Sequence, residues 1–326
     1  MNLINRGDFS DISTKISQRG IPYFLSKLNI QSKKRTLSTF NDPALSGSDW
    51  WIIPEVKRRE NRKISGDEHK TFDTYLTENY FQKDRPYRLL SIGCGLGNRE
   101  LRMAGNNRSV EILGVDLAGN LIGKANKRVQ DTGLTNIRFE QADFYTYPLE
   151  KDSFDAVLFH SGLHHFRNME QIVVKVRESL RPDGVLILNE YAGKNRLQFS
   201  KPQLLEMNRL LQIIPPEYRT RFLTNRLKKK IYAPGLLRMI VSDPSEAVES
   251  EHIREMVHRH FTVLEEKHTG GDLLMMVLKD IAHHFIHPDD AMSQQILEKL
   301  FQEEDSYLEK SENPDFIFGV YRKFQV

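Results

Sequence analysis

The sequence predicts a doubly wound α/β fold, in which helices cover both faces of a parallel sheet. Short apolar runs alternate with longer stretches of helical periodicity, and strands that are buried on both faces are apolar throughout. The apolar runs, which we expect to be strands, are residues 87–92, 110–115, 137–141, 154–159 and 184–189. The helical patterns between them are residues 98–103, 121–131 and 169–180.

We expect residues 1–65 to form an N-terminal arm, because they are polar and are interrupted by several prolines. Trp50 and Trp51 are the exception in this stretch. Each ring hides a large apolar area, so we expect the pair to dock against the protein. Direct contact with a substrate is the alternative.

Residues 66–192 form the predicted core domain, which begins with a helix ahead of the first strand. Ser65 or Asp67 can cap this helix by accepting hydrogen bonds from N–H groups of its first turn. Its apolar residues recur at helical spacing and are Phe72, Tyr75, Leu76, Tyr80 and Phe81.

After Tyr191 the pattern changes to long helical stretches that are rich in basic residues. We expect a helical cap insertion over residues 193–260, broken at Pro215 and Pro216, and a C-terminal region over residues 261–326. The later elements are a strand at 261–265, a helical block at 272–308 and a strand at 316–324. These two strands bring the predicted sheet to seven strands.

The composition is that of a globular protein. The 326 residues are 39% hydrophobic and 28% charged, and the net charge of +3 is too small to predict nucleic-acid binding. No apolar run reaches the roughly 18 residues of a membrane span, and the first residues lack the apolar core of a signal peptide. Cys94 is the single cysteine. We therefore expect a cytoplasmic protein with no membrane span and no nucleic-acid partner.

A glycine loop is the strongest local signal. The first predicted strand leads directly into Gly93, Gly95 and Gly97, and a helical pattern follows. Glycines permit positive φ and the approach of a ligand to bare backbone, and such sheets bind ligands beyond the carboxyl ends of their strands. A dinucleotide site usually has the pattern G-x-G-x-x-G. Asn98 stands at the place of its last glycine, which argues against NAD or FAD.

Carboxylates follow the next two strands. Asp116 ends the second strand, 21 residues after Gly95, where a carboxylate can accept hydrogen bonds from ribose hydroxyls. An ordinary helix cap is the alternative. Asp143 and Phe144 follow the third strand and could bind the amino group and the ring of an adenine. A cap and a core aromatic residue are the alternative for this pair.

Together these motifs resemble the class I S-adenosylmethionine-dependent methyltransferases, particularly the ubiquinone and menaquinone biosynthesis type. The resemblance covers about residues 85–192, and its segments occur in the family's order and at its distances. They are Ile92-Gly93-Cys94-Gly95-Leu96-Gly97, Gly114-Val115-Asp116, Ala142-Asp143, Phe154-Asp155-Ala156-Val157, Leu163-His164-His165-Phe166 and Leu180-Arg181-Pro182-Asp183-Gly184.

The resemblance implies a Rossmann-like seven-stranded sheet with helical cap insertions, and S-adenosyl-L-methionine as the cofactor. It places the glycines beside the methionine part, the first carboxylate at the ribose, and the acid and aromatic pair around the adenine. The residues implied to bind the cofactor are Gly93, Cys94, Gly95, Gly97, Asp116, Leu117, Asp143, Phe144, His160 and Ser161.

The catalytic residues are harder to predict, because a sulfonium methyl group is already activated. The protein must hold a nucleophile in line, exclude water and, for an oxygen or carbon nucleophile, remove a proton. Either His164 or His165 could be the base, since histidine titrates near neutral pH; loop histidines that only pack are the alternative. Glu190 and Tyr191 end the fifth strand and could orient the substrate.

Three further features have ordinary explanations. Cys94 reads as a small filler, since the sequence places no base or cation beside it. His283, His284 and His287 contain an i, i+4 pair, but no other ligand pattern supports a metal site. A basic run in the insertion is either a solvated helix face or a site for phosphate, carboxylate, acidic glycan or a membrane surface. Its members are Arg219, Arg221, Arg226, Lys228, Lys229, Lys230 and Arg238.

We therefore predict an S-adenosylmethionine-dependent methyltransferase that acts on a small-molecule or glycan-like acceptor, at oxygen. A lipid-linked acceptor at a membrane surface fits the basic run as well. Two other functions fit the same fold: an NAD-dependent oxidoreductase, and a non-catalytic methyltransferase-like binding module.

Overall fold

The structure is a computed structural model that describes residues 3–4, 7–9, 13, 48–81 and 85–324. Most of the predicted N-terminal arm lies outside these residues. The chain divides into two compact units. We call residues 63–192, 247–267 and 317–326 the sheet unit, and residues 1–62, 193–246 and 268–316 the helical unit.

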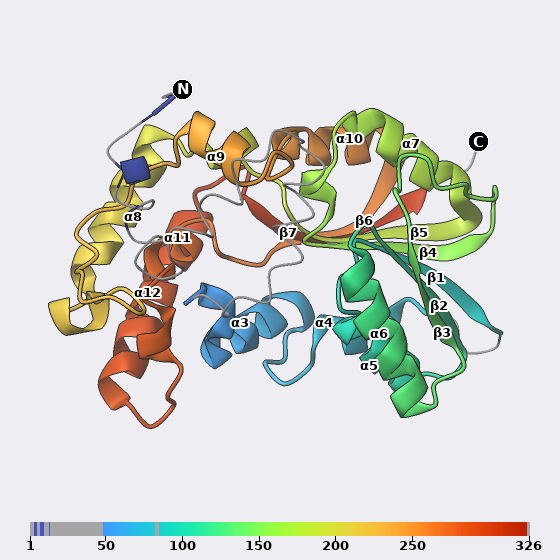
Figure 1. Ribbon diagram of the computed structural model, residues 1–326, viewed down its shortest axis with the longest axis horizontal. Helices are drawn as coiled ribbons and strands as arrows, with labels where there is room; N and C mark the ends of the chain where they lie inside the picture. The colour runs from blue at the N-terminus through green and yellow to red at the C-terminus, as the bar shows by residue number, and fades with distance from the viewer. Residues whose placement is uncertain (1–2, 5–6, 10–12, 14–47, 82–84, 325–326) are drawn as a thin grey trace. The chain divides into compact units, whose positions relative to one another are not determined.

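The sheet unit is built on a seven-stranded sheet with the strand order β3-β2-β1-β4-β5-β7-β6 (Figure 1). The strands are β1 (Tyr87–Ile92), β2 (Val110–Asp116), β3 (Ile137–Gln141), β4 (Phe154–His160), β5 (Leu180–Tyr191), β6 (Phe261–His268) and β7 (Phe316–Lys323). The pairs β2–β3, β1–β2, β1–β4 and β4–β5 are parallel. The predicted doubly wound fold is confirmed, and each of the seven predicted strands is present.

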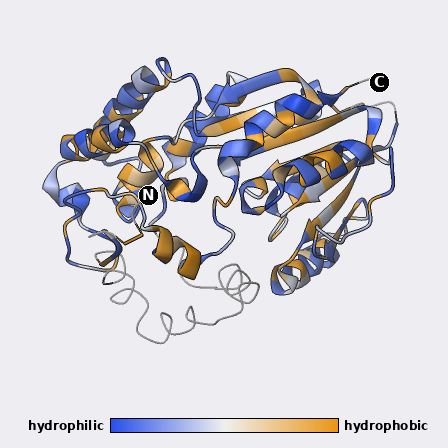
Figure 2. Cartoon of the chain, turned by 90° about the horizontal axis from the view of Figure 1, so that it is seen from above, coloured by the Kyte–Doolittle hydropathy of each residue, from blue (hydrophilic) through white to orange (hydrophobic). Residues whose placement is uncertain are grey.

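Helices pack on both faces of this sheet. One face carries α4 (Phe72–Asn79), α5 (Asn98–Asn106) and α6 (Gly119–Thr132), and the other carries α7 (Met169–Ser179) and α10 (Ile253–His260). Each face has its own cluster of buried apolar side chains. In Figure 2 the strands are mainly hydrophobic, whereas the helices show both hydrophobic and hydrophilic residues. This burial on both sides explains the apolar runs in the sequence.

The strand register brings the functional segments to one edge of the sheet. Ile92 at the end of β1 pairs with Val115 on β2 and with Phe159 on β4. His160 at the end of β4 pairs with Asn189 on β5. Four parallel neighbours therefore end at nearly the same level, and the loops that follow β1, β2 and β4 leave the sheet beside one another.

The helical unit has a separate apolar core. Its main helices are α8 (Lys201–Ile213), α9 (Leu236–Ser242), α11 (Leu274–Leu278) and α12 (Ala291–Leu308), and α3 (Pro54–Ser65) begins in it. Trp50, in the short helix η1 (Trp50–Ile52), is 2% exposed and belongs to this core. Its ring lies 6.0 Å from that of Phe316, in keeping with a structural role for this tryptophan.

The predicted boundaries shift at two places. β5 begins at Leu180, because the Leu-Arg-Pro-Asp-Gly segment already has strand conformation. Residues 247–267, which include α10, belong to the sheet unit and not to the insertion predicted over residues 193–260. α8 ends at Ile213, two residues before Pro215, as the prolines predict. In the described part of the chain, no helix combines the length and apolarity that a membrane crossing requires.

Candidate functional site

The loop between β1 and α5 depends on glycine conformations. Gly93, Gly95 and Gly97 have φ angles of 72°, 54° and 64°, in the left-handed region that L side chains adopt only with strain. The N–H of Gly93 donates to the carbonyl oxygen of Val115 at 2.8 Å, and that of Gly97 donates to the carbonyl oxygen of Cys94 at 2.9 Å. The loop is thereby tied to β2 and turned tightly into α5.

Phe139 adds a second requirement for glycine that the sequence did not reveal. Its ring, on β3, lies against the Cα positions of both Gly97 and Gly114, so that a Cβ at either residue would collide with it. Gly97 is also the N-cap residue of α5. The third glycine thus packs against Phe139 and caps α5, one residue earlier in the chain than the third glycine of a G-x-G-x-x-G loop.

Asp116 connects the end of β2 with the glycine loop. Its carboxylate accepts a hydrogen bond from the N–H of Gly95 at 2.9 Å and another from the N–H of Ala118 at 2.7 Å. The two bonds use different oxygens, and a carboxylate has about four acceptor positions, so each oxygen can accept a further bond. The side chain is half-buried at the strand end. It can therefore hold the loop and still meet a ligand hydroxyl.

Cys94 and Leu117 flank this arrangement, and both are half-buried. Burial, with smaller contributions from the carboxylates of Glu100 and Asp116, raises the pKa of the Cys94 thiol far above its ordinary value. A thiol kept protonated is a poor nucleophile. This is consistent with a filler, and the predicted cofactor contacts of both residues remain predictions.

A buried polar pair lies behind the loop and was not singled out from the sequence. Ser91 in β1 donates to the carboxyl group of Glu100 in α5 at 2.7 Å, and both side chains are buried. Burial raises the pKa of Glu100 above its ordinary value. The available signal was a serine between the apolar residues Leu90 and Ile92, with an acid nine residues after the serine. The pair ties α5 to β1 directly beneath the glycines.

Asp143 and Phe144 have different environments although they are adjacent. The Asp143 carboxylate is half-buried and accepts a hydrogen bond from the N–H of Tyr145 at 3.2 Å. Phe144 is 4% exposed and lies edge-on to the rings of Phe159 and Phe166. Little of the Phe144 ring is left to contact a ligand. The acid is therefore the more accessible member of the pair predicted at the adenine.

His160 and Ser161 leave the sheet at the end of β4. The His160 ring stacks on Phe72 of α4, with 5.2 Å between ring centroids, and its burial, with a further effect from Arg99, lowers its pKa well below the ordinary value. Ser161 has a φ of 52° and donates its N–H to the carbonyl oxygen of Asn189 at 2.8 Å. The exposed Ser161 is thus held in a strained turn at the ligand edge.

Glu190, near the end of β5, holds the loop that follows β4. Its carboxylate is 1% exposed and accepts hydrogen bonds from the N–H groups of Gly162 and Leu163, the latter at 2.8 Å. Its other oxygen lies 2.7 Å from Nδ1 of His164. Although burial alone would raise it, the charge and hydrogen bond of His164 and the two N–H groups lower the pKa of Glu190. Glu190 is therefore an ionised anchor inside the protein.

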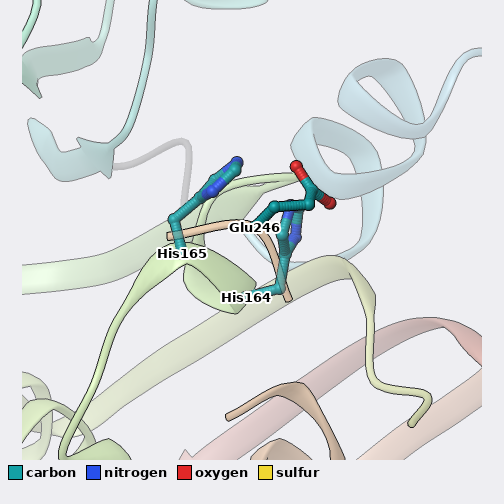
Figure 3. Close-up of side chains that lie close together, drawn as sticks. All are labelled: His164, His165 and Glu246. Carbon is teal, nitrogen blue, oxygen red and sulfur yellow. The ribbon is translucent and has the colours of Figure 1, made fainter. Parts of the chain in front are cut away.

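His164 and His165 share the short helix η2 (Leu163–His165), and Figure 3 shows both imidazoles on this segment. Their ring centroids are 4.2 Å apart. His164 is 8% exposed and His165 is half-buried. The Tyr191 ring is 4% exposed and lies edge-on to His164, with 6.4 Å between centroids. The structure thus brings the four predicted catalytic residues into one cluster, in which only Glu190 is completely enclosed.

The histidines predicted to be structural lie in the helical unit. The backbone N–H of His283 donates to the Ser48 hydroxyl, whose oxygen also lies 2.9 Å from Nδ1 of the same histidine. Burial, with a smaller effect from His284, lowers the pKa of His283 to about 4. His284 Nε2 lies 2.9 Å from the carbonyl oxygen of Thr220. These contacts account for both rings through packing and hydrogen bonding.

The sequence is similar to known methyltransferases over this region. Residues 83–235 match the family described as "Methyltransferase domain". YcgJ of Bacillus subtilis, an uncharacterized methyltransferase, is 32% identical over 110 residues, which cover 33% of this chain and 43% of YcgJ. The 27-O-demethylrifamycin SV methyltransferase of Amycolatopsis mediterranei is 33% identical over 105 residues, covering 32% and 38% of the two chains. Demethylmenaquinone methyltransferase of Thermus thermophilus is 28% identical over 106 residues, covering 32% and 48%.

Among solved structures, phosphoethanolamine N-methyltransferase 2 of Haemonchus contortus, in complex with S-adenosyl-L-methionine, has the same fold. The TM-score is 0.50 at 18% identity, and the match covers 93% of this chain and 59% of that chain. The chain carries a class I S-adenosylmethionine-dependent methyltransferase domain. The predicted family and Rossmann-like fold are confirmed, and demethylmenaquinone methyltransferases are among the distant relatives.

S-adenosylmethionine is the methyl donor of this family. The residues of the methyltransferase domain fit such a ligand, because a glycine loop with accessible backbone lies beside a half-buried carboxylate. The matched stretch covers less than half the length of each of the three curated relatives. The matches therefore concern the methyltransferase domain, and they do not give the acceptor of the whole protein.

Proposed function

We propose that this protein transfers a methyl group from S-adenosylmethionine to a hydroxyl oxygen of a small-molecule or glycan-like acceptor. The observation that carries the proposal is the junction of Asp116 with the glycine loop. Gly93, Gly95 and Gly97 all have positive φ, and the first two leave backbone accessible beyond β1. The carboxylate at the end of β2 accepts a hydrogen bond from the N–H of Gly95. This arrangement suits an adenosyl cofactor whose ribose hydroxyls meet the carboxylate.

The bound cofactor would supply a methyl group that is activated by its sulfonium sulfur. The tasks left to the protein are to position the acceptor and to take up the proton that its hydroxyl loses as the new C–O bond forms. His164 is our candidate for the base. It belongs to the loop after β4, at the same sheet edge as the glycine loop.

Glu190 makes His164 suitable for that role. An ionised carboxylate beside Nδ1 favours the tautomer in which Nδ1 carries the proton and donates to Glu190, which leaves Nε2 as the basic atom. As the acceptor proton moves to Nε2, the buried carboxylate stabilises the resulting imidazolium. Glu190 is a positioning residue in this scheme, because it is enclosed by the loop it holds.

Relatives support a small acceptor. The names of two of them specify demethylated small molecules, demethylrifamycin and demethylmenaquinone, as what they methylate. The first of these is methylated at an oxygen, according to its name. A histidine oriented by a carboxylate is the arrangement that an oxygen acceptor needs, since a hydroxyl must lose its proton to become an ether.

An NAD-dependent oxidoreductase is less well supported. A dinucleotide loop places its third glycine one residue later, where the helix packs around a pyrophosphate. In this chain that position is Asn98, and Gly97 is already the cap residue of α5.

Formation of S-adenosylhomocysteine tests the proposal. The purified protein is incubated with S-adenosylmethionine and either the small-molecule or the macromolecular fraction of a cell extract. We expect product only with the small-molecule fraction, and a decrease of about 100-fold in His164→Gln. His165→Gln is the matched control, since it alters the neighbouring imidazole. Product formed only with macromolecules would contradict the proposed acceptor class, and loss in His165→Gln alone would contradict the assigned base.

A further inference from the structure

A small basic cavity lies in the helical unit, outside the methyltransferase site. Its volume is about 30 Å³, and it is formed by residues near the N-terminus, the segment around 228–233, α9 and the end of α11. The charged residues that line it are Arg221, Lys228, Lys230, Arg238, Lys279 and Asp280. Four of the seven members of the basic run found in the sequence therefore line one cavity, so the run does not form a uniform solvated face.

The cavity has an excess of positive charge. Asp280 accepts a hydrogen bond from Arg221 at 2.6 Å, and Asp8 accepts one from Arg238 at 2.9 Å. Asp49 also interacts electrostatically with Lys279. Among the described residues, the five cationic side chains of the lining therefore face three carboxylates, those of Asp280, Asp8 and Asp49. Like charges gathered around a partly enclosed space repel one another more strongly than they would in open water. An anion in the cavity would relieve this repulsion.

One of the five cations has a structural role. The Nζ of Lys228 donates to the carbonyl oxygens of Met276, Val277 and Lys279, at 2.6, 3.0 and 2.6 Å, and so caps the C-terminal end of α11. Lys228 is 4% exposed and shapes the cavity. Lys230 differs, because its ammonium group lies 5.4 Å from the centre of the Tyr232 ring and its side chain is exposed. Lys230 can therefore turn to a ligand without loss of a buried hydrogen bond.

We propose that this cavity binds the phosphate group of a phosphorylated ligand. A phosphate monoester is a small anion that carries up to two negative charges on three terminal oxygens. These oxygens can accept hydrogen bonds from both the guanidinium and the ammonium groups that line the cavity. About 10 to 15 Å³ is needed to hold one water molecule by this measure, so a cavity of about 30 Å³ admits a single compact head group. The rest of the ligand would lie outside it.

Apolar side chains are exposed on α9, the helix that contributes Arg238 to the cavity, and on the N-terminal segment bonded to it. Leu237 and Ile240 of α9 are 50% and 38% exposed, and Leu3 in the N-terminal segment is 67% exposed. Besides the bond from Arg238 to Asp8, two backbone N–H groups hold that segment against α9: the N–H of Leu237 donates to the carbonyl oxygen of Leu3 at 3.1 Å, and the N–H of Gly235 donates to Asp8 at 2.8 Å. Phosphate chemistry is common to a soluble phosphate ester and a phospholipid head group, and these apolar side chains favour the lipid.

Calorimetric titration at constant ionic strength tests the phosphate site, with inorganic phosphate and glycerol 3-phosphate as the probes. We expect Lys230→Gln and Lys279→Gln each to weaken binding of both probes at least fivefold. Lys229→Gln is the matched control, since it removes the same charge from the adjacent exposed position, outside the cavity lining. It should change the dissociation constant by less than twofold. Thermal melting confirms that each variant is folded.

Vesicles separate the two sources of phosphate. The protein is sedimented with phosphatidylcholine vesicles that either contain or lack phosphatidic acid. Binding that requires phosphatidic acid and falls in both Lys230→Gln and Leu237→Ser supports a lipid ligand, whereas binding of glycerol 3-phosphate alone supports a soluble one. Two results would overturn the proposal: no binding of any phosphate probe, or an equal loss in Lys229→Gln and Lys230→Gln. The affinity for S-adenosylhomocysteine, measured on the same variants, should not change.

Discussion

Two carboxylates in the sheet unit accept hydrogen bonds from the backbone of a loop, but they differ in their exposure. Asp116 ends β2 and accepts hydrogen bonds from the backbone of Gly95 and Ala118, while Glu190 near the end of β5 accepts them from Gly162 and Leu163. Each therefore fixes a loop at the ligand edge of the sheet. Asp116 is half-buried, however, whereas Glu190 is 1% exposed and also contacts His164.

The difference in exposure shows that a carboxylate which fixes a loop can also bind a ligand, or can instead position a neighbouring side chain. A partly exposed carboxylate keeps acceptor positions for a ligand, so its loss should be felt mainly in affinity. An enclosed carboxylate with three donors is committed to the protein, and its loss leaves buried donors without an acceptor. Substitutions of the two acids should therefore separate ligand binding from stability.

The largest effect is expected for Glu190→Gln. The amide keeps the shape of the side chain but removes the charge and one acceptor oxygen. We expect a loss of about 2 to 3 kcal/mol in the free energy of unfolding, measured by urea denaturation. The rate of methyl transfer should fall by more than the loss of stability alone explains. The pH profile of this rate should also change, because the His164 tautomer is no longer fixed.

Asp183→Asn is the control for this substitution, since Asp183 lies on the same strand with its side chain exposed. It should change the unfolding free energy by less than about 0.5 kcal/mol. Equal stability of Glu190→Gln and wild type would refute the view that the buried acid anchors the loop.

A smaller loss of stability is expected for Gly97→Ala. The methyl group would collide with the Phe139 ring, and alanine at a φ of 64° costs about 1 to 2 kcal/mol. The loop should shift, and affinity for S-adenosylhomocysteine should fall about tenfold. Gly105→Ala is the matched control, because Gly105 lies in α5 with open space around it. A Gly105→Ala protein that binds as weakly as Gly97→Ala would show that the effect is not specific to the loop.

The stability of the folded protein at acidic pH should also depend on Glu190. Its pKa is lower in the folded protein than its ordinary value of 4.5, so the folded state holds the proton less tightly than the unfolded chain does. The stabilisation by Glu190 is therefore complete above about pH 4.5 and is lost as the pH falls through the lowered pKa. The melting temperature of wild type should fall more steeply than that of Glu190→Gln between pH 5 and pH 3. Parallel curves would be inconsistent with an ionised Glu190.

The smallest effect is expected for Cys94→Ala. Because burial keeps the thiol protonated, Cys94 should react slowly with iodoacetamide at pH 7, as followed by mass spectrometry. The substitution should change affinity for S-adenosylhomocysteine by less than threefold. Rapid alkylation, or loss of methyl transfer in the alanine variant, would give this thiol a chemical role.

The sequence predicted the sheet well because its physical signals are local. The run from Phe154 to Phe159 is a strand buried on both faces, whereas the edge strand Ile137–Gln141 also has exposed residues. The prolines after Ile213 end α8 as expected. The helical unit was less predictable. Its core joins Trp50, α8, α11 and α12, which are far apart in the sequence, and periodicity does not reveal such pairings.

The site was predicted as a set of residues, but not as a set of contacts. Glycine and carboxylate spacing identified the loop and Asp116, because backbone conformation and strand ends can be read locally. The same reasoning could not show that Glu190 faces His164, 26 residues away, or that Phe144 is enclosed by other aromatic rings. Phe139 and Ser91 were missed because they act through packing and a buried hydrogen bond.

Calorimetric titration with S-adenosylhomocysteine, compared between wild type and Asp116→Ala, tests the central claim most directly. We expect wild type to bind, Asp116→Ala to bind at least about tenfold more weakly, a difference of about 1.4 kcal/mol, and NAD to give no heat. Glu111→Ala, an exposed change on the same strand, should bind like wild type. No binding by wild type, or equal affinity in Asp116→Ala, would contradict the assignment of the cofactor site to this loop and carboxylate.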